Sequence, residues 1–98
     1  MPHPLPKPVI AATPQVADAG AIGRAVRAQR LTAGLRIDDA AALCGVSVTV
    51  LSRLENATSA VTTKSLFKIL DGLGLTLLIL DKLEVSQVLA TLSRQARK

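Results

Sequence analysis

The twenty residues from Ile37 to Asn56 constrain the fold of this chain more than any other stretch. They begin with small side chains, turn at a corner around Gly45, and continue into a second run of mixed apolar and polar residues. Asp38 and Asp39 suit the positive N-terminal end of a helix before the corner. Ser47 suits the N-cap of a helix after it. The stretch therefore predicts two short helices that meet at a glycine corner.

Two short helices around such a corner form a helix-turn-helix, in which the second helix can enter the major groove of DNA. The charge of the chain supports that use, with 12 Lys and Arg against 7 Asp and Glu, a net charge of +5 and a pI of about 10.2. A polyanionic partner is the simplest explanation of this balance. Phe67 is the only aromatic residue, so stacking on single strands is disfavoured, and we expect Phe67 to be a packing residue. The expected partner is double-stranded DNA.

Helical patterns also lie on both sides of this pair. One pattern runs from Gly20 and ends at Gly34, and another follows Thr62 or Thr63, either of which can cap it. A chain of 98 residues with a largely aliphatic core suits one small domain, which we expect to be all-α with four core helices. The apolar positions expected on the two outer helices are Ile22, Val26 and Ala33 on the first, and Leu66, Ile69, Leu70 and Leu73 on the second.

Residues 75–81 predict a single β-strand. The segment follows Gly74, is too short for another helix, and is apolar on both faces. A lone strand needs partners for its backbone N–H and C=O groups, and a thin aliphatic core gains stability by association. We therefore expect the segment to pair with its copy across a two-fold axis in a homodimer. The residues expected at this contact are Leu75, Leu77, Leu78, Ile79 and Leu80.

The two ends of the chain differ from this centre. All five prolines fall within the first fourteen residues, so residues 1–18 predict a flexible, polyproline-like arm. Apolar residues at helical spacing between Val85 and Leu92 predict a basic amphipathic helix or tail over 82–98. That helix would pack on the chain's own dimer or dock on another protein. Residues 19–74 are then the helix-turn-helix domain, and 75–81 the dimerisation strand.

The remaining chemistry of the sequence is sparse. Cys44 is the only cysteine, so no disulfide can form within the chain, and we expect a cytoplasmic protein rather than a secreted disulfide scaffold. Cys44 is interpreted as buried filler or as a redox-sensitive thiol. We expect no metal site, no cofactor and no enzymatic activity, because the residues supply no metal-ligand spacing and no convergent acid, base and nucleophile. No segment is long enough to span a membrane.

The stretch from Ile22 to Asn56 resembles the Cro/C1-type (XRE-like) helix-turn-helix, which implies a lambda-repressor-like fold. Its residues are Ile22-Gly23-Arg24, Val26-Arg27, Arg30, Gly34-Leu35, Gly45-Val46-Ser47 and Leu51-Ser52-Arg53-Leu54-Glu55-Asn56. The resemblance implies a partly buried salt bridge between Arg30 and Glu55 that ties the first helix to the end of the third. It implies a contact of Asn56 with the phosphate backbone. The positions that it implies for facing DNA are Ser47, Val48, Thr49, Ser52 and Arg53.

The chain departs from this family at two places. The family commonly opens the second helix with a Thr-Gln pair, but here Arg36 and Ile37 stand there. Arg36 could replace the lost polar contact with a phosphate contact, and Ile37 could join the core. Val48 can offer a base only an apolar contact, for instance with a thymine methyl group. Arg53 is therefore the best candidate for a base contact, with a phosphate contact as the alternative.

Residues 62–77 resemble the helix-to-strand segment of HipB-type antitoxins. This resemblance implies a dimeric repressor that binds a palindromic operator, autoregulates its operon, and holds a HipA-type kinase toxin. It also implies a bacterial protein, located on the nucleoid when bound to DNA. Two alternatives stay open: a stand-alone XRE-type regulator without a toxin partner, and a helix-turn-helix protein-interaction module with little DNA affinity.

Overall fold

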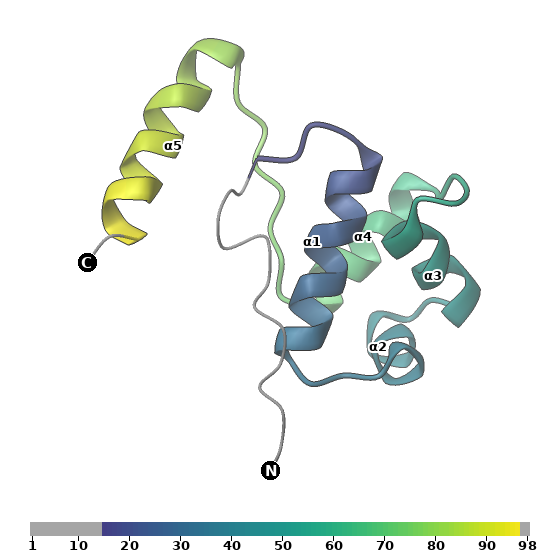
Figure 1. The fold of residues 1–98 in the computed structure, drawn as a ribbon. Coiled ribbons are helices and arrows are strands. Elements are labelled where there is room, and N and C mark those ends of the chain that lie inside the picture. Colours follow the sequence, from purple (N-terminus) through teal and green to yellow (C-terminus); the bar gives the residue numbers. More distant parts are fainter. Residues whose placement is uncertain (1–14, 97–98) are drawn as a thin grey trace.

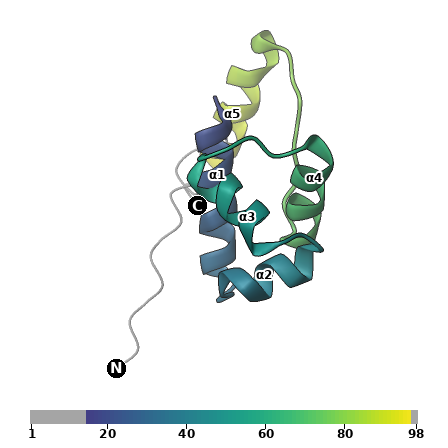
Figure 2. The same cartoon turned by 90° about the vertical axis from the view of Figure 1, so that its right-hand side faces the viewer.

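The computed structural model describes residues 15–96, which form five α-helices and no β-strand. In chain order the helices are α1 (Ala19–Thr32), α2 (Ile37–Cys44), α3 (Val48–Asn56), α4 (Thr63–Gly72) and α5 (Lys82–Ala96). Figure 1 shows α1 to α4 gathered in one bundle, with α5 standing apart on the side away from α2 and α3. Figure 2 shows α3 between α1 and α4, with α2 across their lower end. The expected four core helices and the additional C-terminal helix are confirmed.

Three helices of the bundle begin at a polar side chain that caps them. The side-chain oxygens of Asp18, Ser47 and Thr62 accept hydrogen bonds from the backbone N–H three residues later, at 2.8, 3.1 and 3.1 Å. Each bond satisfies an N–H group that has no partner within the helix. Ser47 is thus the expected cap of α3, and Thr62 rather than Thr63 caps α4.

All four helices of the bundle, α1 to α4, end in a common way. In each case a residue with positive φ follows the helix, and the next backbone N–H donates to the carbonyl oxygen five residues back. This is the Schellman arrangement, which favours glycine because a Cβ atom is unfavourable at positive φ. The positive-φ residues are Gly34, Gly45 and Gly74, each at 72°, and Ala57 at 52°. Only the end of α3 therefore makes this turn with a side chain in place.

The core lies where α1 to α4 meet, and its fully buried large side chains are Val26, Leu51 and Ile69. Ile37 packs against this core, as the sequence suggested. Phe67, expected to be a packing residue, is 52% exposed and is not part of the core. The core-facing positions of α4 follow a 3.6-residue period, and Phe67 falls outside that stripe. Ala33 is also exposed, since α1 ends one residue before it.

Residues 75–81, called the linker below, do not form the expected strand in this single chain. Leu75 packs against the core, but Leu78 is 66% and Ile79 85% exposed. Among the described residues, none makes a backbone hydrogen bond with Thr76–Leu80. A strand exists only where another backbone pairs with it, and residues 15–96 of one copy bring no such backbone to the linker. The expected N-terminal arm falls mostly on residues 1–14, which lie outside the described part of the chain.

Candidate nucleic-acid interface

Helix α3 separates its side chains into a buried and an exposed side. Leu51 and Leu54 are buried in the core, at 0% and 6% exposure. The positions expected to face DNA lie outside this buried side, because Thr49 and Arg53 are two steps from Leu51 and turn away from it, while Ser47 and Val48 are exposed at the N-terminal end of the helix. These positions are Ser47, Val48, Thr49, Arg53 and Asn56, which are exposed, and Ser52, which is half-buried.

Arg53 is the only cation on this exposed face of α3. It lies in the last turn of α3, and no ion pair within residues 15–96 includes it. The guanidinium therefore keeps its five N–H donors available for a planar acceptor such as guanine or a phosphate. Val48, 43% exposed, adds an apolar surface to the same face.

Asn56 is held by its own helix. Its side-chain nitrogen donates to the carbonyl oxygen of Ser52 at 3.0 Å, and lies 3.3 Å from the Ser52 hydroxyl. These bonds fix the amide at the C-terminal end of the exposed face. A phosphate contact by Asn56 would have to use the second N–H of this amide or exchange the bond to Ser52.

The beginning of α2 carries charges of both signs. Arg36 is the N-cap residue of α2, and its Nε lies 3.3 Å from the Asp38 carboxylate in an exposed ion pair. Asp38 and Asp39 both stand in the first turn of this helix. They stabilise the positive end of α2 but oppose the approach of a phosphate. Within residues 36–44 Arg36 is the only cation, so a phosphate at this end of α2 would meet two carboxylates and one guanidinium.

A buried ion pair fixes α3 to α1. Arg30 Nε lies 2.7 Å from Glu55 Oε2, and Arg30 Nη2 donates to Glu55 Oε1 at 2.9 Å. The two side chains are 11% and 3% exposed, and Arg30 also donates to the carbonyl oxygen of Leu35 at 3.0 Å. The hydrogen bond to Glu55 raises the pKa of Arg30 above its ordinary value, so the guanidinium stays charged. The pair implied by the family resemblance is present, and it orients the last turn of α3.

Gly23 contributes to the same contact, a role that sequence reasoning missed. A Cβ atom at this position would collide with the carbonyl oxygen of Leu54 and come within 3.0 Å of that of Glu55. Only glycine therefore lets α1 approach the end of α3 this closely. A comparable contact joins α4 to α2, where Gly72 lies against Cys44. The available signal was a glycine inside each helical pattern, where glycine is unfavourable unless close packing requires it.

The other chemical groups do not form a second site with this face. Cys44 is 6% exposed, its thiol lies 3.6 Å from the carbonyl oxygen of Ile69, and burial raises its pKa. Within residues 15–96, no three His, Cys, Asp or Glu side chains come together in a group that could hold a metal ion. None of the helices in this range is long and apolar enough to cross a membrane.

The comparisons with known proteins agree with this geometry. A family model described as helix-turn-helix matches residues 26–80, which is more than half of the chain and includes all of α2, α3 and α4. No curated protein matches the chain. Domains of this family bind DNA and are not enzymes, which fits the exposed face of α3. From the matched range and the arrangement of α2 and α3, the chain belongs to the XRE-type helix-turn-helix family.

Proposed function

We propose that this protein is a sequence-specific transcriptional repressor that binds double-stranded DNA through α3. The observation that carries the proposal is the exposed Arg53 on a helix whose opposite side is fixed to α1 by the ion pair of Glu55. A helix held in this way presents its side chains to a major groove in one orientation, which is what base recognition needs. Ser47, Val48, Thr49 and Ser52 complete the reading surface.

The substitution Arg53→Ala tests this surface. Loss of a bidentate contact with guanine should weaken binding of the selected site by about 1–3 kcal/mol and relax the preference at one position of each half-site. The binding sites are selected from random duplex DNA, and affinities are measured by fluorescence anisotropy. Arg94→Ala is the matched control, because it removes the same charge from α5, away from α3 (Figure 1). If Arg53→Ala lowers the affinity for every duplex sequence equally, Arg53 contacts the phosphate backbone rather than a base.

The salt dependence of the affinity for duplex DNA distinguishes a DNA-binding repressor from a protein with little DNA affinity. Each phosphate that the protein neutralises releases counterions, so the affinity for duplex should fall linearly on a logarithmic salt scale. Arg36→Ala should reduce this slope by about one if Arg36 contacts a phosphate. An unchanged slope would show that Arg36 contacts no phosphate and keeps its ion pair with Asp38 in the complex.

The proposed repressor is a homodimer joined through the linker. Its support is the linker itself: between Thr76 and Leu80 its backbone forms no hydrogen bond with residues 15–96, and Leu78 and Ile79 are exposed. Pairing with a second copy about a two-fold axis gives this backbone hydrogen bonds and covers these side chains. The two α3 helices would then read a palindromic operator whose half-sites lie about 34–36 Å apart. Sedimentation of the protein at micromolar concentration tests this, and a monomer there contradicts it.

The partner proposed for the repressor is a HipA-type kinase toxin, so that the protein acts as an antitoxin that autoregulates its operon. The support is the resemblance of residues 62–77 to HipB-type antitoxins. Affinity purification from the native cell tests this part, with recovery of a kinase as the expected result. Recovery of DNA alone would favour a stand-alone XRE-type regulator.

A protein-interaction module with little DNA affinity is the second candidate. The observation that favours it is the acidic start of α2, where Asp38 and Asp39 stand near the surface that a phosphate would approach. Val48 also brings no polar group to the reading face. This candidate predicts no binding to genomic duplex fragments even at low salt, whereas the repressor binds them most tightly there.

A further inference from the structure

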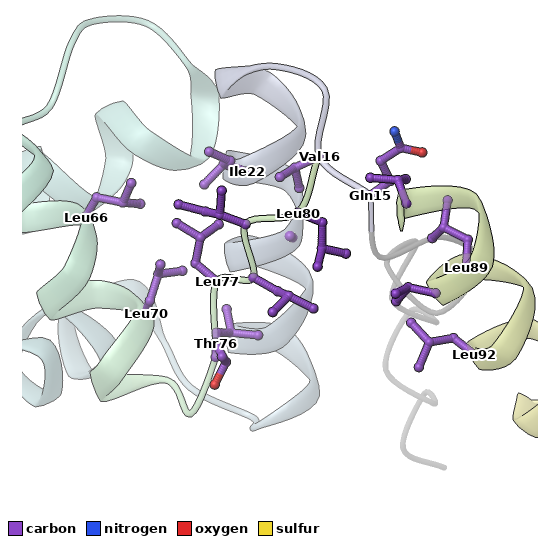
Figure 3. Close-up of a pocket in the computed structure, with 16 residues that line it drawn as sticks. Gln15, Val16, Ile22, Leu66, Leu70, Thr76, Leu77, Leu80, Leu89 and Leu92 are labelled. Carbon is purple, nitrogen blue, oxygen red and sulfur yellow. The ribbon is translucent and has the colours of Figure 1, made fainter. Parts of the chain in front are cut away.

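An apolar groove of about 470 Å³ follows the linker between the helix bundle and α5. Figure 3 shows Leu66 and Leu70 of α4 on one side of the linker and Leu89 and Leu92 of α5 on the other. Ile22 of α1 lies behind the linker on the bundle side. The groove thus has two apolar walls, one on the helix bundle and one on α5, which remain separated in the single chain.

Helix α5 contributes little to the chain's own core. None of its residues belongs to the buried cluster formed by α1 to α4. The linker and α5 together expose Leu78, Ile79 and Leu83 by 66, 85 and 86%, and Leu77 and Leu92 by 38 and 42%. These large apolar side chains stand on two adjoining segments, unlike the single scattered apolar residues of an ordinary surface. Such a surface favours a second copy of the chain as the covering partner.

The geometry of the proposed dimer determines which copy's α4 lies next to α5. Two copies of one strand that pair about a two-fold axis run antiparallel, and pairing centred on Leu78 places Asp81 of one copy opposite Leu75 of the other. Leu75 follows α4 directly, and its N–H donates to the Leu70 carbonyl oxygen at 2.8 Å. Because α5 begins at Lys82, pairing delivers this helix to the α4 wall of the partner copy.

We propose that the two copies exchange their C-terminal helices, so that the apolar stripe of each α5 closes the groove of the other copy against α1 and α4. The stripe consists of Val85, Val88, Leu89 and Leu92, which all line the groove. This inference rests on the proposed dimeric regulator and assigns α5 to its interface. The exchange joins the two apolar walls across the dimer and leaves the α3 faces uncovered on the opposite side of each bundle (Figure 1).

Cross-linking between two distinguishable full-length chains tests the exchange. In a Cys44→Ala background, one chain carries Leu66→Cys and the other, with an added tag, carries Leu89→Cys. After mixing and subunit exchange, a short bismaleimide should join the two chains into a covalent product of mixed mass. The matched surface test compares Leu89→Asp with Ala90→Asp, because Ala90 is exposed on the same turn of α5. Leu89→Asp should raise the dimer dissociation constant at least about tenfold, and Ala90→Asp much less.

The results separate this inference from the proposed function. A mixed product together with the loss of dimer in Leu89→Asp supports the exchange. A dimer that binds DNA but gives no mixed product overturns the exchange and leaves the repressor standing. Cross-linking confined within one chain that carries both cysteines would show α5 closing over its own groove, which also overturns the exchange. A monomer that ignores duplex DNA removes both proposals.

Discussion

The substitution Glu55→Gln tests how strongly the buried ion pair holds α3 in place. Glutamine keeps the shape of the side chain and can accept one hydrogen bond, but Arg30 then stays charged at 11% exposure without a carboxylate. Removing one partner of a buried pair costs roughly 3–5 kcal/mol. Because glutamine preserves one of the two bonds of 2.7 and 2.9 Å, we expect a loss of about 3 kcal/mol. A small domain has only about 5–15 kcal/mol to lose.

Urea unfolding followed by far-ultraviolet circular dichroism measures this loss. A loss of about 3 kcal/mol with an unchanged slope lowers the midpoint by roughly 1–3 M. The control is Asp38→Asn, the same change of an acid to its amide in the exposed ion pair of Arg36 and Asp38. Exposed pairs contribute about 0–1 kcal/mol, so this variant should stay close to the parent protein.

A double variant separates the ion pair from general damage to the core. Arg30→Met combined with Glu55→Leu removes both charges, so no buried charge is left without a partner. The double variant should therefore lose less stability than the two single variants together. If Glu55→Gln lowers the midpoint no more than Asp38→Asn does, the pair does not hold α3 to α1, and the reasoning is wrong.

Three further changes follow from the packing and the ends of the helices. Gly23→Ala should cost at least about 1–3 kcal/mol in thermal or urea unfolding, because backbone atoms of α3 block the new Cβ. Ala57→Gly should raise the free energy of unfolding by up to about 1 kcal/mol, because the residue has φ 52°. Burial raises the pKa of Cys44, so the contribution of the thiol to the free energy of unfolding is complete below its ordinary pKa and falls as the pH rises above it. Cys44→Ala should remove this alkaline loss in a pH series.

Local rules were sufficient for the helices of the bundle. Ser47 and Thr62 are caps that bond to the backbone only three residues later. Gly34, Gly45 and Gly74 lie at helix ends where a backbone hydrogen bond joins residues five positions apart. Each of these features is decided by neighbours in the sequence. The exposed face of α3 followed equally well, because its buried positions alone determine which side turns outward.

Features that depend on distant contacts were harder to predict. Phe67 was expected to be a packing residue, but the stripe around Ile69 already fills the core side of α4. The close approach at Gly23 depends on where α3 ends, which no pattern within α1 reveals. The strand expected over 75–81 depends on a second backbone, so the structure of one chain contains only the linker.

The short length of α3 links the stability of the domain to its reading of DNA. A helix of nine residues is marginal in water, so its position is set by the contacts behind it. Glu55 and Arg53 lie two positions apart on opposite sides of this helix, one buried and one exposed. Glu55→Gln should therefore weaken DNA binding mainly by unfolding or loosening α3, whereas Arg53→Ala should weaken binding with the unfolding midpoint unchanged. Measuring both quantities on both variants separates the residue that positions the reading helix from the residue that reads.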